Sequence, residues 1–212
     1  SVRSMSSSSI FSLFLDLFPS SFFKNRYLIR FFSLFFKKLF SVYTTVYHKG
    51  HELRILTPNF ICKYRVDTFA SKEPGTLDWI DSLPLNSIIW DVGANVGLYS
   101  LYAARSRHAR VYSFEPSVFN LEFLARNIYI NNLQSSVTIL PIALSDSSNI
   151  QSFKMSNTDW GGALSSFGVD FDQYGQIHQS CFEYRTCGLT LDKINSVFEL
   201  PTPDYLKIDV DG

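Results

Sequence analysis

The chain has 212 residues, enough for one domain of ordinary size with a shorter segment attached. Hydrophobic residues make up 46% and charged residues 18%, a composition that excludes an intrinsically disordered chain. Basic and acidic residues number 19 each, so the overall charge does not indicate binding to nucleic acid. The three cysteines form no CxxC pair, which excludes a disulfide framework or a thiolate zinc site and favours a cytoplasmic location.

The charges are unevenly distributed along the chain. Residues 1–50 carry seven basic side chains and one acidic side chain, and half of the 20 phenylalanines lie before residue 41. Residues 51–212 carry twelve basic and eighteen acidic side chains. We therefore predict two parts that join near Gly50, a basic Phe-rich segment (1–50) and a globular domain (51–212).

Within the first part, residues 26–45 predict a helix. Its polar residues recur every three or four positions and form one narrow stripe, while aromatic and aliphatic side chains cover the rest. Such a helix can lie in a membrane interface with its cations at anionic headgroups, or it can pack against a protein surface. Its charges argue against a helix that spans the bilayer. The Ser-rich start of the chain leaves a targeting peptide open. The stripe consists of Arg26, Arg30, Ser33, Lys37 and Ser41.

After Gly50 the pattern changes to alternating strands and helices. Strands that alternate with helices through short links predict a parallel sheet with right-handed crossovers, an α/β, Rossmann-like fold. Residues 156–180 read as a polar, Gly-rich excursion. The predicted elements are a hairpin of strands 51–56 and 60–69, helix 74–83, strand 87–92, helix 98–105, strand 109–114, helix 117–131, strands 137–144 and 149–155, helix 191–198 and strand 205–210.

The strongest motif is DVGANVG at residues 91–97, where the strand predicted over 87–92 ends. Gly93 permits a tight turn and a close approach of the backbone, and Gly97 permits close packing of the next helix. A dinucleotide-binding loop would carry glycine where Asn95 stands. Asp91 would repel a pyrophosphate but suits a ligand that carries a cation, such as a sulfonium or an α-ammonium group.

The second motif is Phe114-Glu115-Pro116, at the end of the next strand. A carboxylate in this position can accept both hydroxyl protons of a ribose, a contact used for NAD and for S-adenosylmethionine. Together with the first motif it favours S-adenosylmethionine.

An ordered set of motifs resembles the FkbM-type S-adenosylmethionine-dependent methyltransferases. The resemblance covers roughly residues 60–212, and the set is more specific than any single motif. Its members are SKEPGTLDWID (71–81), DVGANVGLYS (91–100), FEP (114–116), Asn131-Asn132, ALSD (143–146), LTLD (189–192) and KIDVDG (207–212).

The resemblance implies a class I methyltransferase fold with the methyl donor over the ends of the first two strands. It implies that the acceptor is a hydroxyl of a small molecule or glycan, and that the sheet continues beyond Gly212. Because the chain stops there, we expect this piece to have weak activity or none. The donor site implied consists of Asp91, Gly93, Ala94, Asn95 and Gly97 for the methionine part, Glu115 and Pro116 for the ribose, and Ala143 and Leu144 for the adenine.

A hydroxyl acceptor must lose its proton, so a positioned carboxylate would help as a general base. Asp209 and Asp211 at the last strand are the candidates, and we predict no metal site. The alternative is that Asp209 only anchors the donor and Asp211 is a turn residue. Glu73 is a further candidate for contact with the donor, and residues 160–166 form either a cover over the acceptor or an ordinary surface loop.

Two other functions remain open. A nicotinamide-dependent oxidoreductase is disfavoured by Asp91 and Asn95. A non-catalytic protein could instead keep half of the fold and bind a membrane surface or a partner through residues 26–45.

Overall fold

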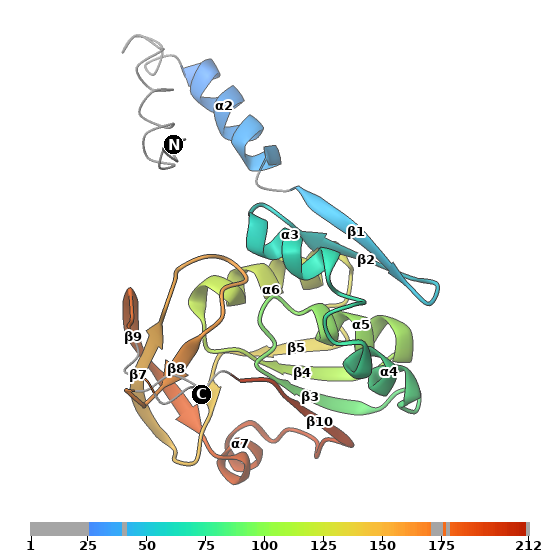
Figure 1. Ribbon diagram of the computed structural model, residues 1–212, viewed down its shortest axis with the longest axis vertical. Helices are drawn as coiled ribbons and strands as arrows, with labels where there is room; N and C mark the ends of the chain where they lie inside the picture. Colours follow the sequence, from blue (N-terminus) through green and yellow to red (C-terminus); the bar gives the residue numbers. More distant parts are fainter. Residues whose placement is uncertain (1–25, 40–41, 171–175, 177–178, 211–212) are drawn as a thin grey trace. The chain divides into compact units, whose positions relative to one another are not determined.

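The computed structural model describes residues 26–39, 42–170, 176 and 179–210 (Figure 1). The chain divides into two units, residues 1–42 and 43–212. In the first unit the described element is helix α2 (Arg26–Leu39), which exposes Phe31 and Leu34 as well as Arg26 and Arg30. Among the described residues, no helix has the length and apolar character needed to cross a bilayer. Contact of α2 with a membrane or with a protein surface stays a prediction.

Helix α2 is shorter than the helix predicted over 26–45. Residues 43–45 belong instead to strand β1 (Tyr43–His48), which pairs with β2 (His51–Leu56) as an antiparallel hairpin. The β-branched and aromatic residues of β1 favour an extended chain. Lys49 and Gly50 connect the strands with φ of 43° and 83°, the two positive values that a tight hairpin turn requires. Gly50, predicted near the boundary of two parts, therefore lies inside one hairpin, while Ser41 lies outside the described residues.

The hairpin predicted from strands 51–56 and 60–69 is wrong. The second segment is helix α3 (Phe60–Asp67), and the partner of β2 is β1. Asn59 begins the helix because its side chain accepts a hydrogen bond from the Cys62 N–H. This capping contact and the preceding Pro58 mark a helix start that the β-branched and aromatic composition obscured.

The predicted parallel sheet is confirmed. Four strands pair in the order β10-β3-β4-β5, and all of them are parallel. Helices lie in the connections between these strands. The strands are β3 (Ile88–Val92), β4 (Arg110–Phe114), β5 (Val137–Leu140) and β10 (Tyr205–Ile208). The helices confirm the predicted ones and are α4 (Pro74–Ser82), α5 (Leu98–Arg107), α6 (Val118–Ile130) and α7 (Leu191–Phe198).

Both faces of the sheet are covered. Ile89 and Val111 pack into one core with α5 and α6, whereas Trp90, Tyr112 and Phe114 pack into the other core, which includes Ile194 of α7. Figure 1 shows α5 and α6 on one side of these strands and α7 on the other. Burial on both sides explains why the strands read as nearly continuous apolar runs.

A second sheet lies beyond the carboxyl ends of the parallel strands (Figure 1). The strand predicted over 137–144 is interrupted at Pro141, which cannot donate to a ladder. Its end becomes β6, which pairs in parallel with β9, and β7 matches the strand predicted over 149–155. The strand order is β6-β9-β7-β8, with bounds Ala143–Leu144, Phe182–Leu189, Asn149–Met155 and Ser165–Phe167.

Two buried asparagines, Asn127 on α6 and Asn131 at its C-terminal cap, attach the β1–β2 hairpin to the parallel layer. Asn127, fully buried, accepts from the Leu56 N–H and donates to the Val96 carbonyl, both at 2.9 Å. About one helical turn further along, the side chain of Asn131 accepts a hydrogen bond from the Arg54 N–H at 2.9 Å and donates one to the Arg54 carbonyl. These side chains satisfy backbone groups that would otherwise be buried without partners.

We predict that Asn127→Ala destabilises the fold strongly. The substitution leaves the Leu56 N–H and the Val96 carbonyl without partners, at a cost of roughly 2–4 kcal/mol in the free energy of unfolding. Chemical denaturation measures this value. Arg126→Ala, on the exposed side of the same helix, is the control and should change it by less than about 0.5 kcal/mol. Equal values for the two variants would contradict this role of Asn127.

Candidate functional site

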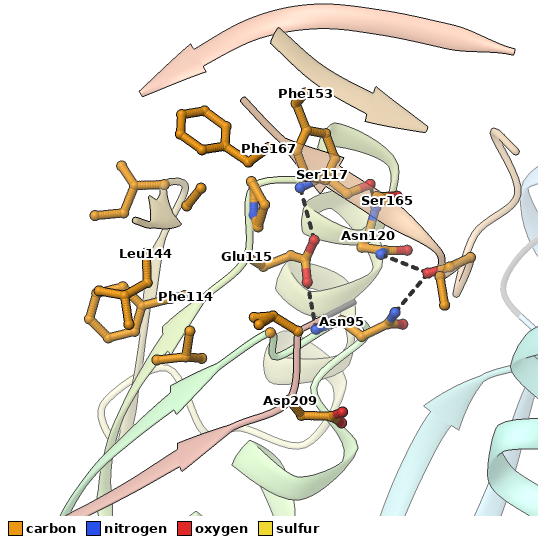
Figure 2. Close-up of a pocket in the computed structure, with 18 residues that line it drawn as sticks. Asn95, Phe114, Glu115, Ser117, Asn120, Leu144, Phe153, Ser165, Phe167 and Asp209 are labelled. Carbon is orange, nitrogen blue, oxygen red and sulfur yellow. Dashed lines mark hydrogen bonds between the residues drawn. The ribbon is translucent and has the colours of Figure 1, made fainter. Parts of the chain in front are cut away.

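A pocket lies where the parallel strands end and the second sheet begins (Figure 2). Its empty volume, which includes space open to solvent, is about 620 Å³. We call it the carboxyl-edge pocket. Its lining combines polar groups from the strand ends with apolar side chains from both sheets, and includes Gly93, Asn95, Phe114, Glu115, Pro116, Ser117, Asn120, Ile142, Ala143, Leu144, Phe153, Ser165, Phe167 and Asp209.

Glu115 lies at the centre of this pocket with only 5% of its surface exposed. One carboxylate oxygen accepts from the Asn95 N–H at 2.7 Å, and the other accepts from the Ser117 N–H at 2.8 Å (Figure 2). The side chain thereby joins the turn after β3 to the turn after β4. A carboxylate offers about four acceptor positions, so it can accept a ligand hydroxyl besides these backbone contacts.

Burial raises the pKa of Glu115 to about 7. The hydrogen bonds from Ser117, Asn95 and Asn120 act in the opposite direction, and the nearby charge of Asp91 adds to the rise. Near neutral pH the carboxyl is thus close to the midpoint between its charged and neutral forms.

The glycines of the 91–97 motif have partners different from those expected. At Gly93, with φ of 81°, a Cβ would lie 1.9 Å from the Asp209 carbonyl oxygen, so the close approach is to the residue that follows β10. At Gly97, with φ of 89°, a Cβ would lie 2.4 Å from Leu124 Cδ1. Gly97 therefore lets the start of α5 approach α6, rather than a strand. The N–H groups of Gly93 and Ala94 both donate to the Phe114 carbonyl.

Asn95 connects this turn to the segment 160–166. It adopts φ of 52°, a left-handed conformation that asparagine tolerates. Its side-chain nitrogen Nδ2 donates to the Gly162 carbonyl at 2.8 Å. Asn120 of α6 donates to the same carbonyl at 3.2 Å (Figure 2). The side-chain oxygen of Asn120 also accepts from the Gly161 N–H at 3.0 Å. Of the two interpretations of this segment, the structure favours the one in which it covers a site, because Gly162, Ala163 and Ser165 line the pocket.

Asp91 is placed behind the pocket and does not line it. Its carboxylate accepts from the Ser100 hydroxyl at 2.5 Å and pairs with the Lys207 ammonium at 3.1 Å. Burial alone would lower the pKa of Lys207, but the charges of Asp91 and Asp209 outweigh it and the pKa is raised. The cation that Asp91 meets in this structure is therefore a lysine of β10.

Asp209 lines the pocket, and its side chain is 59% exposed. It lies 3.4 Å from Lys207 Nζ, so the lysine bridges the two aspartates. Asp211 lies outside the described residues. Within the part of the chain that is described, no group of three His, Cys, Asp or Glu side chains is placed to hold a metal ion.

The structure brings together most of the predicted site residues and adds others. Gly93, Asn95, Glu115, Pro116, Ala143, Leu144 and Asp209 line one pocket, whereas Asp91, Ala94 and Gly97 do not. Among the residues that sequence reasoning missed are Ser117, Asn120, Phe153 and Phe167. One signal was available in the sequence. Asparagines at 120, 127 and 131 share the buried face of a predicted helix, and buried polar side chains indicate hydrogen bonds to other parts of the protein.

The sequence model described as "Methyltransferase FkbM domain" matches residues 91–212, more than half of the chain. The chain belongs to the FkbM methyltransferase family. The match begins at Asp91, near the end of β3, and includes β4, β5 and β10, and therefore the polar part of the carboxyl-edge pocket.

Two curated proteins show local similarity. Methyltransferase sdnD of Sordaria araneosa is 42% identical over 69 residues, which cover 32% of this chain and 27% of that protein. The AMB antimetabolite synthetase AmbE of Pseudomonas aeruginosa is 39% identical over 72 residues, which cover 34% of this chain and 3% of that protein. The chain thus matches under a third of the length of either relative.

Among solved structures, a putative transferase of Pyrococcus horikoshii is 16% identical, with a TM-score of 0.37 over 49% of this chain and 37% of that one. The fold assignment therefore rests on the strand order of this FkbM-family chain and not on that similarity.

We predict that Glu115 makes the stability of the ligand-free protein depend on pH. Because its folded pKa of about 7 exceeds the ordinary value of 4.5, the folded state holds more protons between these values. The free energy of unfolding should therefore fall as pH rises from about 4.5 to 7, by on the order of 3 kcal/mol from this group.

The measurement is urea denaturation across this pH range for the wild type and Glu115→Gln, comparing slopes against pH rather than absolute values. The variant should lack this part of the slope. Glu122→Gln, an exposed carboxyl on α6, should keep it. A wild-type slope retained in Glu115→Gln would show that another group titrates there.

Proposed function

We propose that this FkbM-family chain carries the donor site of an S-adenosylmethionine-dependent methyltransferase that acts on a hydroxyl of a small molecule or glycan. The observation that carries the proposal is the buried Glu115 carboxylate, which lines a pocket beside the tight turn that begins at Gly93. Three features of the pocket support it, one for each part of the donor.

The first feature is the ribose position. Each Glu115 oxygen accepts one backbone N–H, and a carboxylate offers about four acceptor positions in all, so ribose hydroxyls can donate to it as well. The contact needs the ionised form, because a protonated carboxyl offers one acceptor fewer.

The second feature is an apolar slot for a purine ring. Phe114 lines the slot from the parallel sheet, and Ala143, Leu144, Phe153 and Phe167 line it from the second sheet. Figure 2 shows Leu144 close to Phe114, and Phe153 and Phe167 above them. Flat apolar side chains on two sides suit an aromatic base, since ring contacts add to the area buried. We therefore keep Ala143 and Leu144 as adenine contacts and add the two phenylalanines.

The third feature is the methionine end. Gly93 and Asn95 border the pocket there, and the exposed Asp209 carboxylate suits an α-ammonium group. Asp91 lies behind this turn, so we assign it a supporting role: its charge holds Lys207, which in turn lies near Asp209.

The reaction would require little covalent chemistry from the protein. The donor supplies a methyl group on a sulfonium, and the chain holds donor and acceptor in line and excludes water. Gly162, Ala163 and Ser165 of the 160–166 segment line the pocket, and this segment would serve the second purpose. The alternative role of Asp209 is to accept the proton of an acceptor hydroxyl instead of binding the α-ammonium group.

Titration calorimetry with S-adenosylhomocysteine, using NADH as the comparison ligand, tests the proposal. We expect S-adenosylhomocysteine to bind and NADH to fail. Glu115→Ala should weaken binding by about 1–3 kcal/mol through the lost ribose contacts, and Glu122→Ala should not. Wild-type affinity should rise as pH passes through about 7, where Glu115 ionises. Binding of NADH alone, or equal affinity in both variants, would contradict the proposal.

A further inference from the structure

A second pocket adjoins the carboxyl-edge pocket across the 160–166 segment. Its empty volume is about 550 Å³, and Gly162 and Ala163 line both pockets. We call it the α3 pocket, because helix α3 supplies one of its walls. Its remaining lining residues are Ile61, Tyr64, Arg65, Lys72, Asn157, Gly161 and Leu164.

The wall from α3 is fixed to the segment that separates the pockets. Asn59 and Cys62 both donate to the Trp160 carbonyl, and Arg65 Nε donates to the Gly161 carbonyl at 2.7 Å. These three residues are spaced by three, so they lie on one face of the helix. The bond through Nε orients the Arg65 guanidinium, and its two terminal nitrogens make no hydrogen bond within the described part of the chain.

The charges in the α3 pocket have one sign. Arg65 and Lys72 are the charged residues of its lining, and no carboxylate is among the lining residues. Glu73 and Asp159 stand nearby without lining it; Lys72 lies 3.6 Å from Glu73 in an exposed pair that water screens. Beside the cations, Ile61, Tyr64 and Leu164 provide apolar surface.

We propose that the α3 pocket binds a carboxylate or phosphate group of the methyl acceptor, with an apolar part of the same molecule against Tyr64 and Leu164. An oriented guanidinium with free terminal nitrogens matches two anionic oxygens at once, and a nearby lysine adds charge. The proposal rests on the proposed function and narrows its substrate to an anionic hydroxyl compound.

The donor carries a carboxylate too, but the geometry favours the acceptor as the source of the anion. Arg65 and Lys72 do not line the carboxyl-edge pocket. Gly162 and Ala163 stand between, and the Gly162 carbonyl is held there by the side chains of Asn95 and Asn120. A group bound in the α3 pocket is therefore beside the donor and not part of it.

The test uses benzoate, a carboxylate with an apolar ring, as the probe in protein saturated with S-adenosylhomocysteine. Amide NMR shifts of Gly161 and Gly162 should report its binding. Arg65→Gln, which keeps a donor for the Gly161 carbonyl, and Lys72→Gln, which touches no part of that segment, should each weaken the probe at least about tenfold. Lys63→Gln is the control, because Lys63 pairs with Asp67 outside the pocket.

Unchanged benzoate affinity in both variants would overturn the proposal. It would also be overturned if both variants weakened S-adenosylhomocysteine but not 5′-methylthioadenosine, since the cations would then hold the donor's own carboxylate. If the wild type failed to bind S-adenosylhomocysteine, the proposed function would fail. In that case benzoate binding that depends on Arg65 and Lys72 would still establish the anion site.

Discussion

The buried carboxylate of Glu115 is the interaction on which the site depends. It accepts the N–H groups of Asn95 and Ser117 and so fixes the turns after β3 and β4 to each other. From Asn95 the contacts continue to the Gly162 carbonyl, which brings a segment distant in sequence over the pocket. Burial destabilises the ionised form of Glu115 and so raises its pKa to about 7. A ligand that donates hydroxyl groups to the carboxylate would reduce this destabilisation.

A second set of charges supports the same edge of the sheet from behind. Lys207 of β10 lies between Asp91 of β3 and Asp209. Two neighbouring parallel strands are thereby joined by side chains as well as by their ladder. Asp91 is buried in its ion pair with Lys207, whereas the carboxylate of Asp209 is exposed. Lys207 therefore lies between an aspartate with a structural role and an aspartate that a ligand can reach.

The alternation of strands and helices could be predicted because it depends on local patterns. Periodicity located the strands of the parallel sheet, and Gly93, Asn95 and Glu115 marked the edge of the sheet at which the pocket lies. The failures are local conflicts between signals. Residues 43–45 continued an apolar helical pattern but are β-branched or aromatic, and Phe60–Asp67 resembled a strand although Asn59 caps a helix.

The rest of the site could not be predicted because it depends on contacts between residues far apart in sequence. Asp91 and Lys207 are 116 positions apart, and Asn95 and Gly162 are 67 apart. No spacing rule relates such residues, so the role of Asp91 and the position of the 160–166 segment required the fold. The same is true of Phe153 and Phe167, which reach the pocket from a sheet whose pairing the sequence does not reveal.

The most direct test of the central claim is a crystal structure of the protein with S-adenosylhomocysteine. The account predicts both ribose hydroxyls within hydrogen-bonding distance of the Glu115 carboxylate and the adenine between Leu144 and Phe153 or Phe167. A ligand bound elsewhere, or a ribose held by other residues while Glu115 keeps only its contacts to Asn95 and Ser117, would contradict it.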